Sequence, residues 1–76
     1  GTEQLDVAFK KQGMRPQGGI DIGNNVWFGS HVQVLDGVTI GDDSIIGAST
    51  VVNKDVAQFD VVAGVPMKKL KSRSAS

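Results

Sequence analysis

The sequence lacks cysteine and tyrosine, and only two of its 76 residues are proline. Without cysteine, a disulfide framework and a thiolate zinc site are both excluded. Eight Lys and Arg residues balance eight Asp and Glu residues, so the basic excess of a nucleic-acid-binding module is absent. No apolar run approaches the roughly 18 residues of a membrane span, and no stretch reads as a secretory leader. We therefore expect a cytoplasmic protein that binds neither nucleic acid nor membranes.

The small size of the chain limits the core that it can build alone. A domain of this length buries only about 60% of the surface that its unfolded chain exposes. Since neither disulfides nor a metal is expected, we expect the chain to need a partner surface.

What the sequence does contain is a repeat of six residues. An aliphatic or aromatic residue recurs at Ile22, Phe28, Val34, Ile40, Ile46 and Val52. A helix repeats near 3.6 residues and a simple strand alternates, so the period of six fits neither. The next position is glycine or asparagine in every case except Leu35, and we expect a positive-φ corner there. The position two residues before is small or β-branched: Val26, Val32, Val38, Ser44, Thr50 and Val56. Each hexad is thus a short strand followed by a corner.

The pattern resembles the hexapeptide repeat of left-handed parallel β-helices, in which three hexads make one triangular coil. The left hand comes from this resemblance alone. Residues 22–57 hold two coils, the period breaks at Gln58, and residues 61–64 form one more partial strand. We expect an all-β fold with an irregular N-terminal arm over residues 1–19, a β-helix over 20–65 and a basic tail over 66–76.

Stacking in such a coil places residues 18 apart above one another. The sequence predicts Trp27 over Ile45, Gln33 over Val51 and Thr39 over Ala57. An exposed Trp stacked on an exposed Ile is costly in water, which indicates either contact with a neighbouring molecule or cover by the N-terminal arm.

Several ordered motifs resemble a known enzyme family. They are IGNNVWFGSHV from residue 22, GVTIGD from residue 37, IGA from residue 46, VVNKD from residue 51 and VAGVP from residue 62. Together they resemble the C-terminal part of the acetyl-CoA-dependent O-acetyltransferases of the galactoside, maltose and capsular-polysaccharide type. The resemblance implies a homo-oligomer, usually a trimer, with acetyl-CoA bound between adjacent solenoids and a saccharide-like acceptor.

Carried over position by position, the resemblance implies seven cofactor-binding residues and no metal: Trp27, Ser30, Ala48, Asn53, Lys54, Lys68 and Lys71. Ser30 and Ala48 would line the pantetheine arm, and their spacing of 18 independently stacks them at one corner. Asn53 and Lys54 would lie near the adenine end. Lys68 and Lys71 occupy positions near the phosphates where the family often has arginine. Without the family, small corner residues and a solvated basic tail would explain the same features.

No residue of the chain is predicted to be catalytic. Acyl transfer to a hydroxyl needs a proton acceptor, and histidine suits that task. In the resembled family this histidine lies upstream of the region matched, and we interpret His31 as a corner residue. We likewise interpret Asp42 and Asp43 as turn residues, not as an acid–base pair. The chain alone is therefore expected to be inactive. The alternative is a non-catalytic solenoid that serves oligomerisation or binding.

Overall fold

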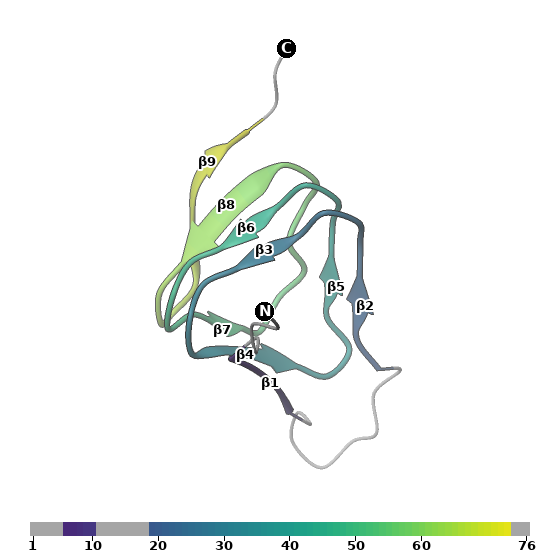
Figure 1. Ribbon diagram of the computed structural model, residues 1–76, viewed down its shortest axis with the longest axis vertical. Helices are drawn as coiled ribbons and strands as arrows, with labels where there is room; N and C mark the ends of the chain where they lie inside the picture. The colour runs from purple at the N-terminus through teal and green to yellow at the C-terminus, as the bar shows by residue number, and fades with distance from the viewer. Residues whose placement is uncertain (1–5, 11–18, 74–76) are drawn as a thin grey trace, which may run out of the picture.

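The computed structural model describes residues 6–10 and 19–73, which form nine β-strands and no helix (Figure 1). The strands are β1 (Val7–Lys10), β2 (Asp21–Ile22), β3 (Trp27–Phe28), β4 (Val32–Leu35), β5 (Thr39–Ile40), β6 (Ile45–Ile46), β7 (Val51–Val52), β8 (Asp60–Ala63) and β9 (Lys68–Ser72). Within these ranges no helix is long and apolar enough to cross a membrane.

The strands stack into three sheets that form the sides of a triangle (Figure 1). The sheet orders are β1-β4-β7, β2-β5 and β3-β6-β8-β9. Neighbouring strands are parallel in all three sheets, except that β9 runs antiparallel to β8. This is the all-β, parallel solenoid that the six-residue period predicts. The left hand of the coil stays a prediction.

The first stacked layer has the predicted spacing. Trp27 pairs with Ile45, and Gln33 pairs with Val51. These partners are 18 residues apart, so three hexads make one circuit of the triangle here.

The next layer is two residues shorter, and the predicted stack of Thr39 on Ala57 is wrong. Ile40 pairs with Val56, sixteen residues on, and the backbone N–H of Thr39 donates to Asp55 Oδ1 at 2.9 Å. The period therefore breaks before Val56, not at Gln58. The physical reason is burial: Val56 is 3% exposed beside Ile40 in the core, whereas the six-residue count would have brought the amide of Gln58 inward.

The repeated glycines serve close packing between layers, and the expected positive φ at these positions is wrong. A Cβ atom on Gly29 would lie 2.5 Å from Ala48 N, and one on Gly41 would lie 2.5 Å from Gln58 N. Neither glycine has a positive φ. Backbone of the next layer passes where a side chain would begin, so these positions exclude any larger residue.

Positive φ occurs two residues later in the first five hexads. The residues with this conformation at six-residue spacing are Asn25, His31, Gly37, Asp43 and Ser49. Asn and Asp tolerate the left-handed region because their short polar side chains bond locally. The corner is therefore turned at these residues.

The core is a column of aliphatic side chains inside the triangle. Its buried members are Val32, Val34, Val38, Ile40, Ile46, Val52, Val56 and Val62, each no more than 3% exposed. Two hydroxyls share this interior. Ser44 Oγ donates to Gly41 O at 2.8 Å, and Thr50 Oγ1 donates to Gly47 O at 2.6 Å, so neither hydroxyl is buried without a partner.

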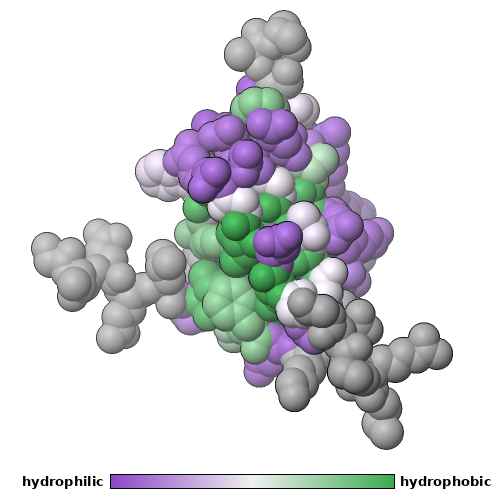
Figure 2. Space-filling model, turned by 90° about the vertical axis from the view of Figure 1, so that its right-hand side faces the viewer, coloured by the Kyte–Doolittle hydropathy of each residue, from purple (hydrophilic) through white to green (hydrophobic). Residues whose placement is uncertain are grey.

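Part of the core reaches the surface. Phe28 and Ile20 are only partly buried against it, and Ile22 is 37% exposed. Figure 2, which views the side of β2 and β5, shows apolar side chains in the middle of this face and polar side chains above them. The described chain therefore leaves apolar surface that a partner could cover.

Both ends of the chain contain strands that the sequence did not predict. Val7–Lys10 pairs with β4 in parallel, with Val7 opposite Val32, so this part of the expected irregular arm is wrong. Lys68–Ser72 forms a hairpin with β8 instead of a plain tail. The rest of the arm (residues 1–5 and 11–18) and the end of the tail (residues 74–76) lie outside the described residues.

Candidate cofactor-binding surface

Three corners join the sheets, and the predicted site residues are distributed over two of them and one sheet. The Asn corner (residues 23–25 and 41–43) follows β2 and β5. The Ser30 corner (residues 29–31 and 47–49) follows β3 and β6. The Lys54 corner (residues 36–37 and 53–55) follows β4 and β7.

The Ser30 corner brings Ser30 and Ala48 into one line parallel to the solenoid axis. The backbone N–H of Ser49 donates to Ser30 O at 2.7 Å, and both Ser30 and Ala48 are exposed. Gly29 and Gly47 precede them and have no side chain to project from the corner. A ligand could therefore approach the backbone along this line.

Trp27 begins a second line on the outer face of the β3-β6-β8-β9 sheet. Trp27 pairs with Ile45, Ile45 with Val61, and Val61 with Lys71. Trp27 is 64% exposed, whereas Ile45 and Val61 are half-buried. Adjacent strands lie about 4.8 Å apart, so about 14 Å separates the backbone of Trp27 from that of Lys71. An apolar strip thus ends at a cation.

Strand β9 and Arg73 after it carry basic side chains, which differ in whether they contact an acceptor in the described part of the chain. Lys69 Nζ lies 3.4 Å from the buried Asp60 carboxylate. Arg73, just after the strand, donates from Nη1 to Asp43 O at 2.7 Å. Lys68 and Lys71 are exposed, and the described part of the chain gives their side chains no such partner. These two ammonium groups remain available to an anion.

Asn53 and Lys54 lie apart from the other predicted site residues. They follow β7, whereas Ala48 precedes it, so the two groups are at opposite ends of the β1-β4-β7 sheet. A four-residue strand such as β4 spans about 13 Å. Within one chain, the predicted residues form two surfaces, not one pocket.

His31 is an exposed corner residue. Its Nδ1 lies 2.5 Å from Asp6 Oδ2, and the side chains are 75% and 57% exposed, respectively. The contact joins the residue before β1 to the residue before β4. An exposed pair of this kind contributes little to stability. Among the residues that the structure describes, no group of three or more His, Asp or Glu side chains is arranged to hold a metal ion.

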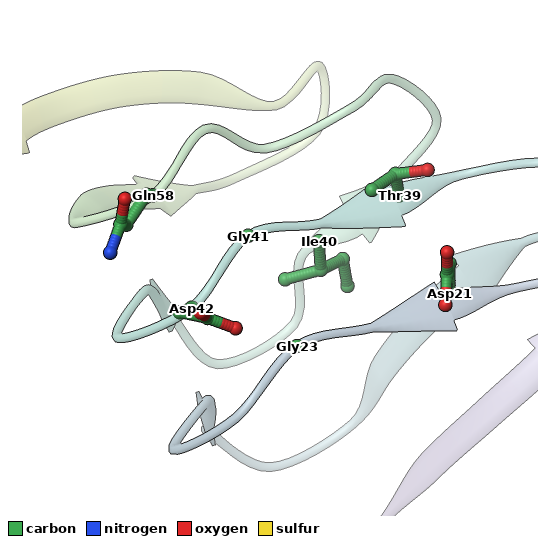
Figure 3. A pocket seen from close by; sticks show the side chains of 7 residues that line it. All are labelled: Asp21, Gly23, Thr39, Ile40, Gly41, Asp42 and Gln58. Carbon is green, nitrogen blue, oxygen red and sulfur yellow. The ribbon is translucent and has the colours of Figure 1, made fainter.

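The structure has an open groove of about 330 Å³ away from all seven predicted residues. Figure 3 shows Asp21 and Thr39 on adjacent strands β2 and β5, with Asp42 and Gln58 beyond them at the corner. Two carboxylates and no cation line this groove, so its electrostatics are unsuited to a phosphate.

Sequence reasoning missed Asn25 as a residue of functional interest. Its side-chain oxygen accepts from Trp27 Nε1 at 3.3 Å, and its Nδ2 donates to Asp43 Oδ1 at 2.9 Å. The signal was present, since Asn25 lies 18 residues before Asp43, which we interpret from the sequence as a turn residue. Asp43 is indeed a turn residue, with φ 60°.

Comparisons with known proteins agree with this architecture. The sequence profile described as bacterial transferase hexapeptide (six repeats) matches residues 19–54. Galactoside O-acetyltransferase of Escherichia coli (strain K12) is 56% identical over 52 residues, which are 68% of this chain and 26% of that protein. A structure of galactoside acetyltransferase in complex with coenzyme A has a TM-score of 0.70 and 53% identity, covering 72% of this chain and 28% of that chain.

A more distant structure covers more of the fold. Serine acetyltransferase of Neisseria gonorrhoeae has a TM-score of 0.83 at 29% identity, over 93% of this chain and 28% of that chain. The chain spans 26% to 35% of the length of the curated relatives that it matches. The ordered motifs, the solenoid and these relatives lead to one conclusion: the chain belongs to the hexapeptide-repeat acetyltransferase family.

Proposed function

We propose that this chain is the C-terminal segment of an enzyme that moves an acetyl group from acetyl-CoA to a hydroxyl of a sugar-like acceptor. One observation carries the proposal: an open corner of small residues and an adjacent apolar strip run parallel to the solenoid axis, and β9 crosses their end with two lysines that have no side-chain partner among residues 6–10 and 19–73. Coenzyme A has the matching chemistry, because its thin pantetheine arm leads to a phosphorylated nucleotide.

Each predicted residue has a role in this arrangement. Ser30 and Ala48 leave room for the pantetheine arm, and Trp27 offers an apolar face beside it. Lys68 and Lys71 contact phosphate oxygens as point charges, without the bidentate geometry of arginine. Binding therefore depends on charge attraction at the phosphate end of coenzyme A and on the small size of the corner residues along its pantetheine arm.

Asn53 and Lys54 fit the same site only if a second subunit supplies them. A closed ring with the β1-β4-β7 sheet toward its axis would bring the Ser30 corner of one subunit to the Lys54 corner of the next. We therefore propose a trimer, the assembly that the family resemblance implies. A cytoplasmic location is part of the proposal, since acetyl-CoA is available there.

The chain supplies cofactor-groove residues but no proton acceptor in this proposal. Deprotonation of the acceptor hydroxyl needs a base within hydrogen-bond reach of it. The imidazole of His31 is bound to Asp6 and open to solvent at the corner. We therefore propose that the base belongs to a part of the protein outside this sequence, and that this chain alone does not transfer acetyl groups.

Titration calorimetry of the purified chain with coenzyme A tests the proposal. Light scattering first checks for a mass three times the 8.0 kDa of one chain. We expect Lys71→Ala to weaken binding about tenfold, because a charge-assisted hydrogen bond is lost. Lys54→Ala should also weaken it if that residue comes from the neighbouring subunit.

Lys69→Ala is the matched control, because it removes the same charge from the same strand at a side chain that contacts Asp60. Equal losses for Lys69→Ala and Lys71→Ala would show only non-specific attraction. A trimer that gives no heat with coenzyme A would favour the alternative, a non-catalytic oligomerisation module. Acetyl transfer by the chain alone, abolished by His31→Ala, would overturn the assignment of the base.

A further inference from the structure

The indole of Trp27 is held by a short chain of hydrogen bonds from the Asn corner. Trp27 Nε1 donates to Asn25 Oδ1 at 3.3 Å, and Asn25 Nδ2 donates to Asp43 Oδ1 at 2.9 Å. Arg73 Nη1 donates to the carbonyl oxygen of the same Asp43 at 2.7 Å. The Asn25 amide thus joins the indole to the corner of the next layer, and Arg73 contacts the backbone of that corner.

The chemistry of the partners determines which way this amide points. An ionised carboxylate can only accept, so Asp43 requires the NH₂ group of Asn25. The amide oxygen is then directed to the other side, where the indole N–H, which can only donate, needs an acceptor. The indole is therefore bonded in one orientation.

The backbone reinforces this arrangement. Asn25 and Asp43 have φ values of 59° and 60°, so both lie in the left-handed region. The N–H of Asp43 also donates to Asn24 O at 3.0 Å, which keeps the two turns in register. Both side chains therefore leave equivalent backbones and meet at a defined distance.

We propose that Asn25 is a positioning residue that fixes the indole of Trp27 as a platform for coenzyme A, and that Asp43 orients Asn25 for this task. The inference rests on the proposed function. The platform stands at one end of the apolar strip formed with Ile45 and Val61, whose other end is Lys71. An indole held in place contacts the ligand without losing side-chain freedom on binding, which improves affinity.

Fluorescence can test this directly, because Trp27 is the only tryptophan in the sequence. Asn25→Gly removes the amide and keeps a residue that accepts positive φ. We expect faster nanosecond depolarisation of the indole and a coenzyme A dissociation constant about three- to tenfold higher, the effect of losing one hydrogen bond. Asn24→Ala is the control, because Asn24 contacts Asp42 through its backbone N–H; it should change neither quantity.

An exchange of the two side chains gives a second test. Asn25→Asp alone places two carboxylates together and should loosen the indole. Combined with Asp43→Asn, the new amide can donate to the new carboxylate, which still accepts from Trp27, so anisotropy and affinity should both recover. Circular dichroism confirms that each variant is folded.

The outcomes separate this inference from the function on which it rests. If the parent chain fails to bind coenzyme A, the proposed function is wrong, and so is the claim that Trp27 is a platform for this ligand. The fluorescence anisotropy would still decide whether Asn25 fixes the indole. If the parent chain binds and Asn25→Gly has parental anisotropy and affinity, Asn25 does not position Trp27. An exchange variant that stays as loose and weak as Asn25→Asp would also overturn the role of Asp43.

Discussion

A Cβ atom on Gly29 would lie 2.5 Å from the backbone nitrogen of Ala48. The next two atoms that it would meet, Ala48 Cα at 2.8 Å and Gly47 C at 3.0 Å, are also backbone. This steric clash could be relieved only if the two stacked corners moved apart, because the atoms that the Cβ would meet belong to the backbone and not to a flexible side chain. The line of small residues along the Ser30 corner is thus set by packing between layers as well as by any ligand.

Gly29→Ala should accordingly destabilise the fold. Overpacking of this kind costs about 1–3 kcal/mol, and separation of the corners would also strain the bond from Gly29 N to Ile46 O, now 2.8 Å. Urea denaturation followed by circular dichroism measures the change. A Gly29→Ala variant as stable as the parent would show that the layers can separate here without cost.

Gly47 offers a version of this contact that can be repaired. Its added Cβ would meet Ala63 Cβ at 2.9 Å, while the next atom, Val62 O, is at 3.4 Å. Gly47→Ala should therefore destabilise the chain, and the addition of Ala63→Gly should restore part of the loss. A coupling free energy of about 0.5 kcal/mol or more is expected for side chains in contact. Strict additivity of the two changes would contradict the assigned contact.

These glycines also show how far the sequence could predict the fold. The six-residue period located the strands from Asp21 to Val52 and the buried column, because each hexad brings one aliphatic residue inward at a fixed place. It misassigned the function of the glycines, because a requirement for positive φ and a requirement for small size select the same residue. Only the position of the neighbouring layer shows which of the two requirements applies, and that position is not encoded in the local sequence.

The two-residue deletion before Val56 was hidden for a similar reason. Val56 fits the sequence pattern either as a small residue or as an inward aliphatic one, and only its pairing with Ile40 decides. The strand at Val7–Lys10 was missed because its partner Val32 lies 25 residues from Val7, a spacing that no hexad count produces.

At the candidate site, the spacing of 18 residues predicted the line through Ser30 and Ala48. The hydrogen bond between Asn25 and Trp27 depends on side-chain geometry, which no period encodes.

Ser49 tests where the corner is turned. It is exposed and has φ 60°, a conformation that costs an ordinary residue about 1–2 kcal/mol. Ser49→Gly should leave stability unchanged or raise it, whereas Ser49→Val, with a β-branched side chain, should lower it. Thermal unfolding of the two variants gives the comparison. Equal stability of the glycine and valine variants would place the corner at another residue.

Thr50 and Thr39 allow the value of one buried hydroxyl to be measured against an exposed one. Thr50 is fully buried; its Oγ1 donates to Gly47 O at 2.6 Å and accepts from Gly64 N at 3.1 Å. Thr50→Val keeps the shape but leaves that N–H and that carbonyl without the hydroxyl, which should cost about 1–3 kcal/mol in the free energy of unfolding. The exposed Thr39 bonds Asp55 through its backbone, so Thr39→Val should change stability by less than about 0.5 kcal/mol. The N–H of Gly64 donates to the Thr50 hydroxyl. Amide hydrogen exchange at Gly64 should therefore accelerate in Thr50→Val and not in Thr39→Val. Equal losses of stability in the two variants would mean that the valine methyl group, not the missing hydrogen bonds, determines the effect.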